Sequence, residues 1–227
     1  EFNEQDLANT AWAYSTAGIS YADQSSALFD AIEKASIKKI GEFNSQGLAN
    51  TAWAYSTMGI SAPALFDAIA SKATEKVDEF NSQDLSNTIW AFARLNHKPK
   101  QLMRAVASEA QKKLADFNPQ GIANTLWAFA TLAHYGEQFP VLLHAIATEA
   151  LAKMHLFNPQ NLANAAWAFA RVGHHPGQKI LSGLAHFSTL QLDAFKPQEM
   201  ANLVWAFAKT GHPAPELMDA IAAAVKS

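Results

Sequence analysis

The chain has 227 residues, of which 49% are hydrophobic and 16% charged, and it contains no Cys, which excludes disulfides, thiolate nucleophiles and zinc–thiolate sites. Gly and Pro number only 10 and 9, so the composition excludes collagen, argues against disorder and favours helices. The formal net charge of -3 is not the basic balance of a protein that grips phosphates non-specifically.

Six tryptophans mark six copies of one motif. Each Trp stands ten residues after a Phe, with a Gln three residues and an Asn seven residues after the same Phe. The copies begin near Phe2, Phe43, Phe80, Phe117, Phe157 and Phe195. Their tryptophans are Trp12, Trp53, Trp90, Trp127, Trp167 and Trp205. A motif that returns about every 38 residues is typical of a repeat protein.

The first half of each copy is predicted to be a helix of about 15 residues. An Asn that directly follows the Phe can cap the helix N-terminus in five copies, with Lys196 as the exception. We expect the helix to end at a left-handed Gly or Asn in five copies and at Ala133 in the fourth. The five expected end residues are Gly18, Gly59, Asn96, Gly173 and Gly211.

A second helix follows in each copy and is clearest over residues 63–79, 99–116 and 140–156, where apolar residues recur at helical spacing. Two helices of this size cannot bury their apolar faces alone, whereas stacked copies can. The sequence therefore predicts an all-α fold. We expect a right-handed α-solenoid of six tandem helix-turn-helix repeats of about 38 residues, as a single segment over residues 1–227.

The chain opens directly on a repeat motif, without the polar cap that terminal repeats normally carry, and it ends inside a second helix. We therefore expect a segment of a longer protein, so the absence of a targeting peptide says little. The longest uncharged stretch, residues 117–136, contains several amides and is predicted to be a repeat helix rather than a membrane span.

On a helical projection the first helix of each copy is apolar almost all round and keeps one narrow polar stripe, formed by the Gln, the Asn and any basic residue. We predict that the stripe binds RNA through Gln5, Asn9, Gln46, Asn50, Gln83, Asn87, Arg94, Gln120, Asn124, Gln160, Asn164, Arg171, Gln198, Asn202 and Lys209. Four polar residues at its edge could select bases, namely Asp6, Asp84, Asn161 and Glu199.

Stacking would place these stripes roughly 8–10 Å apart, one per repeat. Amides can pair with base edges and basic residues can hold phosphates, so the row suits a single strand of RNA. Structural alternatives stay open. The amides could instead hydrogen-bond to the next repeat, because buried polar groups need partners. The acidic edge residues could simply complement the helix dipole.

Other recurring residues are predicted to be structural. A row of Trp suggests stacking on bases. Because its flanks are apolar and every copy needs a core residue, we instead expect the Trp row, and the Tyr or Phe two residues after each Trp, to lie in the core. The Ala directly after each Trp would let a ligand approach closely. Four His residues just past the first helices are expected to be loop or cap residues, because a row spaced by one repeat cannot share a metal ion. They are His97, His134, His174 and His212.

The sequence contains no catalytic motif such as His-Glu-x-x-His, Gly-x-Ser-x-Gly or a Gly-rich phosphate loop. A repeat array spreads polar groups evenly, whereas catalysis needs a convergent cluster. We therefore expect a protein that is not an enzyme and that binds no metal or cofactor.

The motif resembles the octotricopeptide repeat, a helix-pair repeat of about 38 residues. The resemblance is carried by residues 157–170, which read Phe-Asn-Pro-Gln-Asn-Leu-Ala-Asn-Ala-Ala-Trp-Ala-Phe-Ala, and the copies that begin at Phe117 and Phe195 look the same. The motif is also similar to the helical repeats of RAP-domain organellar RNA-binding proteins, although no RAP domain is visible.

The resemblance implies an RNA-binding protein of the chloroplast or mitochondrion that acts in RNA stability, splicing, translation or ribosome assembly. Single-stranded RNA would lie along the inner face of the first helices, and protein partners in a large complex are also implied. Because the chain is acidic and has few Arg residues, the alternative is a protein-interaction scaffold or accessory subunit of a large organellar complex.

Overall fold

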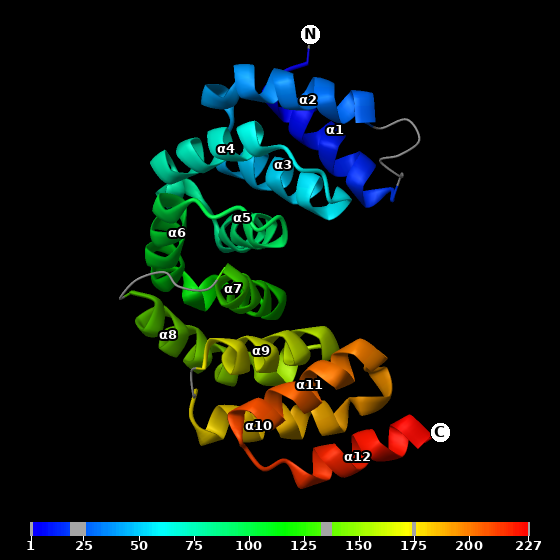
Figure 1. Ribbon diagram of the computed structural model, residues 1–227. Coiled ribbons are helices and arrows are strands. Elements are labelled where there is room, and N and C mark those ends of the chain that lie inside the picture. Colours follow the sequence, from blue (N-terminus) through cyan, green and yellow to red (C-terminus); the bar gives the residue numbers. More distant parts are fainter. Residues whose placement is uncertain (1, 19–25, 133–137, 174–175, 227) are drawn as a thin grey trace. The chain divides into compact units, whose positions relative to one another are not determined.

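The computed structural model describes residues 2–18, 26–132, 138–173 and 176–226, which form twelve α-helices and no strand (Figure 1). The first helices of the six copies are α1 (Glu4–Thr16), α3 (Ser45–Met58), α5 (Ser82–Arg94), α7 (Pro119–Leu132), α9 (Pro159–Val172) and α11 (Pro197–Thr210). The second helices are α2 (Ser26–Lys38), α4 (Pro63–Glu75), α6 (Lys100–Lys112), α8 (Gln138–Lys153), α10 (Gln178–Leu190) and α12 (Pro215–Lys226). An all-α fold of repeating helix pairs is therefore confirmed, while the handedness of a solenoid stays a prediction.

The chain divides into two compact units, Glu1–Lys113 and Leu114–Ser227, and each unit contains three helix pairs. In the first unit α1, α3 and α5 pack in one row, and α2, α4 and α6 pack in a second row. The second unit repeats this arrangement with α7, α9 and α11 in one row and α8, α10 and α12 in the other. Each unit is thus a two-layer array with its apolar core between the rows.

The predicted N-caps of the first helices are confirmed. The Oδ1 atom of each capping Asn accepts a hydrogen bond of 2.7–2.9 Å from the backbone N–H three residues later. The five caps are Asn3, Asn44, Asn81, Asn118 and Asn158. Lys196 makes no side-chain cap bond, and its own N–H donates to Glu199 at 2.8 Å instead.

The predicted helix ends are confirmed where they fall within the described residues. Five residues take a positive φ between 54° and 69°, which is the left-handed conformation that stops an α-helix. They are Gly18, Gly59, Asn96, Gly173 and Gly211. Ala133, the predicted end of the fourth first helix, lies outside the described residues.

The second helices end earlier than predicted. α4 ends at Glu75 and is followed by a separate 3₁₀ turn, η3 (Val77–Glu79), and α8 is followed in the same way by η5 (Met154–Leu156). The turn redirects the chain so that the Phe of the next copy enters the core, and Phe80 and Phe157 are only 1% and 2% exposed. Apolar spacing continues across the turn, so the sequence pattern did not reveal the break.

Neighbouring first helices pack through small residues. In α9 Ala163 and Ala166 are at most 1% exposed, whereas the equivalent residues of α11, Ala201 and Val204, are exposed. This comparison identifies the side that α9 turns toward α11, because α11 has no further first helix beside it within its unit. Small side chains there let the helix axes approach closely.

The Ala directly after each Trp lies on the opposite side of the first helix, and the prediction that it admits a ligand is wrong. Ala54, Ala91, Ala168 and Ala206 are at most 2% exposed, whereas Ala13 in α1 is exposed. A methyl group at this position is needed because the preceding first helix of the unit packs against it.

In four copies a long polar side chain four residues before the next Phe closes the helix pair, a contact that the sequence pattern did not reveal. The Nζ atom of Lys113 donates to the carbonyl of Phe80 at 2.7 Å and pairs with the buried Glu109 at 3.0 Å. Lys153 and Gln191 make the equivalent bonds to the Phe that begins their own copies, at 2.8 and 3.0 Å. The end of the second helix is thereby tied to the start of the first.

We expect the substitution Lys113→Met to lower the free energy of unfolding by about 1–3 kcal/mol. Hydrogen bonds from Lys112 and Lys113 lower the pKa of the buried Glu109 carboxyl, so the substitution leaves a charged group and a carbonyl with fewer partners. Lys113→Gln is the matched control and should lose less, because Gln191 makes this contact in the fifth copy. Denaturant titration followed by circular dichroism measures both. Equal losses would contradict the assigned contact.

Candidate functional site

The polar stripe of each first helix is exposed to solvent. Its Gln is exposed in all six copies, and its Asn is exposed in α1 and half-buried in the other five. Neighbouring first helices cover two sides of a central helix such as α3 or α9, and the second helix covers a third. The remaining side is what we call the ridge, formed by the residues 3, 7, 10 and 14 positions after each Phe. Arg94, Arg171 and Lys209 occupy its last position and are exposed.

The Trp row belongs to the ridge, so the prediction that it lies in the core is wrong. Trp12 and Trp205 are 46% and 42% exposed, and the other four tryptophans are half-buried. Steps of four, three and four residues return to one side of a helix with 3.6 residues per turn. The Tyr or Phe two residues later is in the core as predicted, since Tyr55 and Phe92 are fully buried, although Tyr14 is only half-buried.

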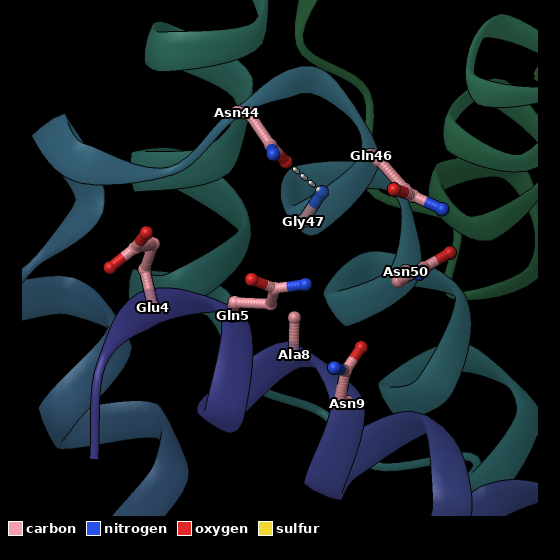
Figure 2. A pocket seen from close by; sticks show the side chains of 8 residues that line it. All are labelled: Glu4, Gln5, Ala8, Asn9, Asn44, Gln46, Gly47 and Asn50. Atoms are coloured by element: carbon pink, nitrogen blue, oxygen red, sulfur yellow. Dashed lines mark hydrogen bonds between the residues drawn. The ribbon is translucent and has the colours of Figure 1, made fainter.

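Amides from α1 and α3 meet around a notch of about 30 Å³ in the first unit (Figure 2). The notch is lined by Glu4, Gln5, Ala8, Asn9, Asn44, Gln46, Gly47 and Asn50. The side chain of Asn44 is occupied in capping α3, where its Oδ1 accepts from the N–H of Gly47 at 2.7 Å. Four predicted site residues, two from each helix, are therefore brought together.

The ridge amides do not tie the repeats together. Over the residues that the structure describes, their side chains make one hydrogen bond, from Gln198 Nε2 to Asn202 Oδ1 at 3.2 Å within α11. The alternative in which they bond to the backbone of the next repeat has no support in this geometry. The remaining amides can offer both a donor and an acceptor to a ligand.

Two of the basic ridge residues lie against the Trp of their own helix. The Cζ atom of Arg94 is 5.3 Å from the ring centroid of Trp90, and that of Arg171 is 5.5 Å from Trp167. Both distances are within the range of a cation–π contact. Arg94 also donates from Nε to the carbonyl of Ser56 in the preceding first helix at 2.9 Å, so it has a structural contact that is not found for Arg171 among the described residues.

The four edge residues, Asp6, Asp84, Asn161 and Glu199, complete the N-terminal caps. A side-chain oxygen of each accepts a hydrogen bond from the backbone N–H of the cap residue, at 2.8–3.3 Å. Asp84 and Asn161 are each only 5% exposed. This geometry assigns them a structural role at the helix N-terminus, where the dipole alternative also placed them, and base selection stays a prediction.

Burial raises the pKa of the Asp84 carboxyl, although hydrogen bonds from the backbone of Asn81 and the side chain of Ser45 and the charge of Lys113 act to lower it. A carboxyl with a raised pKa in the folded state costs stability once the pH exceeds the pKa of the unfolded chain, which is near 4 for Asp. The cost is complete above the folded-state pKa.

We therefore expect Asp84→Asn to raise the thermal midpoint at pH 7, with a gain that shrinks to nothing as the pH falls toward 4. The amide keeps the cap, because Asn161 makes the same bond at the equivalent position of α9. Asp6→Asn is the matched control, since Asp6 makes the same bond on the exposed end of α1. Thermal melts at several pH values test this, and a midpoint at pH 7 that falls in Asp84→Asn would contradict it.

Two of the four recurring His residues are described, and both join the end of a first helix to the preceding second helix. His97 Nε2 lies 2.8 Å from Asp67 in α4, and His212 Nε2 lies 3.2 Å from the Ser182 hydroxyl in α10. These positions fit the predicted loop or cap role. His134 and His174 lie outside the described residues.

The repeats match a known protein family. A family model described as RNA-editing substrate-binding complex 6 protein matches residues 1–175. The chain belongs to this family. A second model, described as a protein of unknown function, matches residues 192–204. No curated protein matches the chain. Neither family model names the octotricopeptide repeat, so that resemblance stays a prediction.

The match to the RNA-editing substrate-binding complex 6 family covers the whole first unit and continues in the second through α9. It therefore includes the notch and five of the six ridges. Within the described residues, this family member has no group of three His, Cys, Asp or Glu side chains that could hold a metal ion. None of its described helices is long and apolar enough to cross a membrane.

Proposed function

We propose that this chain binds single-stranded RNA along the ridges of its first helices, as a component of an RNA-editing substrate-binding complex in the mitochondrion. The observation that supports the proposal most strongly is the row of ridge amides, which are accessible and largely unused by the fold. The family name refers to a complex that binds RNA-editing substrates. Of the two organelles that the sequence resemblance implied, this family favours the mitochondrion.

The ridge offers suitable chemistry for a single strand. Each amide carries a donor and an acceptor that can pair with the exposed edges of unstacked bases. Arg94, Arg171 and Lys209 can contact phosphates. Within each unit three ridges follow one another, because the first helices pack in sequence. A strand lying across a unit would therefore meet one set of contacts per repeat.

A scaffold role within the complex is a second candidate, favoured by an apolar surface in the last copy. A hollow of about 500 Å³ is lined there by apolar residues of α11, α12 and the loop between them, among them Val204, Pro213 and Met218. Such exposed apolar surface commonly marks a contact with another protein. Pull-down from a source extract, with and without ribonuclease, separates partners held by protein from those held by RNA.

We expect Arg171→Ala to weaken binding of single-stranded RNA about fivefold at low salt, because one phosphate contact is lost. The slope of log affinity against log salt should become shallower by about 0.7. Lys179→Ala is the matched control, since Lys179 is an exposed cation on the second helix α10 and should leave both quantities unchanged. Fluorescence anisotropy with a labelled oligonucleotide over a salt series measures them.

An equal effect of Arg171→Ala and Lys179→Ala would show that the ridge is not the RNA-binding surface. Failure of the folded wild-type chain to retain any RNA at low salt would overturn the proposed function altogether.

A further inference from the structure

We propose that the ridge tryptophans are stacking platforms for unpaired bases, and that stacking rather than phosphate charge supplies most of the affinity for single-stranded RNA. The inference rests on the proposed function and specifies how that surface would hold its ligand. The proposed ligand is single-stranded RNA that is held by its bases and not by its charged backbone alone.

The exposure of the indoles is the first observation. Trp12 and Trp205 are 46% and 42% exposed on the outer helices α1 and α11. On the central helices α3 and α9, Trp53 and Trp167 are still half-buried, although Tyr55 and Phe169, two residues later, are fully buried. A Trp needed only for packing would be as buried as Tyr55 or Phe92, which are fully buried. A flat ligand can bind favourably to a large apolar ring that is exposed to water, because covering the ring removes apolar surface from water.

The direction of the indoles is the second observation. The Trp lies between the ridge Asn and the last ridge position, so its ring borders the groups that can bind base edges and phosphates. Arg94 and Arg171 lie close to the rings of Trp90 and Trp167, at 5.3 and 5.5 Å from the centroids. Guanidinium groups stack on aromatic rings and on bases alike. A base could therefore lie on the indole and still contact the guanidinium.

The tryptophans also form a succession within each unit. Trp167 and Trp205 come from neighbouring first helices of the second unit, and their ring centroids are 6.4 Å apart with an interplanar angle of 34°. Trp12 and Trp53 stand on α1 and α3, which likewise pack side by side in the first unit. Successive repeats thus present successive rings, which is the arrangement that single-strand binders use for consecutive bases.

The negative net charge of the chain also favours base stacking over phosphate contacts. It has 17 Lys and Arg residues against 20 Asp and Glu, and only three of the six ridges end in a basic residue. Phosphate contacts at those few cations would give a weak and salt-sensitive interaction. Every ridge, by contrast, carries a Trp. Stacking on aromatic rings tolerates any sequence and does not depend on a positive net charge.

The test compares an oligoadenylate of about 12 nucleotides with an abasic ribose–phosphate chain of the same length and charge. We expect the wild-type chain to bind the oligoadenylate at least tenfold more tightly. Trp12→Ala and Trp205→Ala should each weaken its binding about five- to 100-fold, with the abasic chain little affected. Trp12→Phe should restore part of the loss, because a smaller aromatic ring still stacks.

Matched controls are available at exposed apolar residues outside the ridge. Phe2 is 59% and Val204 38% exposed, so Phe2→Ala and Val204→Ala remove exposed apolar side chains and should change the affinity less than twofold. Circular dichroism and thermal melts check that each variant is folded. All four side chains are exposed, so truncating them should leave the fold intact. A loss of binding can then be separated from a loss of the fold.

Three results would overturn the inference. If the abasic chain binds as tightly as the oligoadenylate, or if the Trp variants behave like Phe2→Ala and Val204→Ala, the ridge still binds RNA but does not stack bases. If the folded wild-type chain binds neither ligand, the proposed function fails and the stacking inference fails with it.

Discussion

Neighbouring first helices approach each other through small side chains, and this contact determines which side of each first helix can face solvent. Ala163 and Ala166 of α9 form one such surface, and the buried Ala206 of α11 belongs to the surface that packs against it. Two sides of a central first helix are thereby occupied, and its second helix takes a third. Only one side is left for solvent, so the polar residues of the first helix are gathered there. The ridge is a consequence of how closely the helices pack.

The parts of the fold that depend on local chemistry were predictable from the sequence. The Asn that follows the Phe in five copies favours an N-cap for the next helix, and a Gly such as Gly173 ends a helix because it adopts a positive φ without strain. The 3₁₀ turns and the contact from Lys113 to Phe80 were not predictable in this way. Both depend on where the end of one helix meets the start of another, which a single repeat unit of sequence does not specify.

The candidate site was likewise predictable from the sequence only in part. The ridge amides were identified because a polar residue on an otherwise apolar helix must face solvent or a partner. Hydrophobicity alone predicts burial for Trp12, which is wrong, whereas the small size of Ala54 wrongly predicts access for a ligand. The spacing of the Trp, three residues after Asn9 and four before the last ridge position, already placed it on the polar side. A small residue such as Ala54 serves a ligand or a helix equally well, and only the neighbouring helix decides which.

Ultraviolet crosslinking can show whether RNA lies on the first-helix ridges. The folded chain is bound to single-stranded RNA, irradiated with ultraviolet light and digested, and the crosslinked peptides are sequenced by mass spectrometry. We predict crosslinks at ridge residues, above all at the tryptophans and their neighbouring amides. Crosslinks confined to the second helices, or a complete absence of crosslinks from a chain that remains folded, would contradict it.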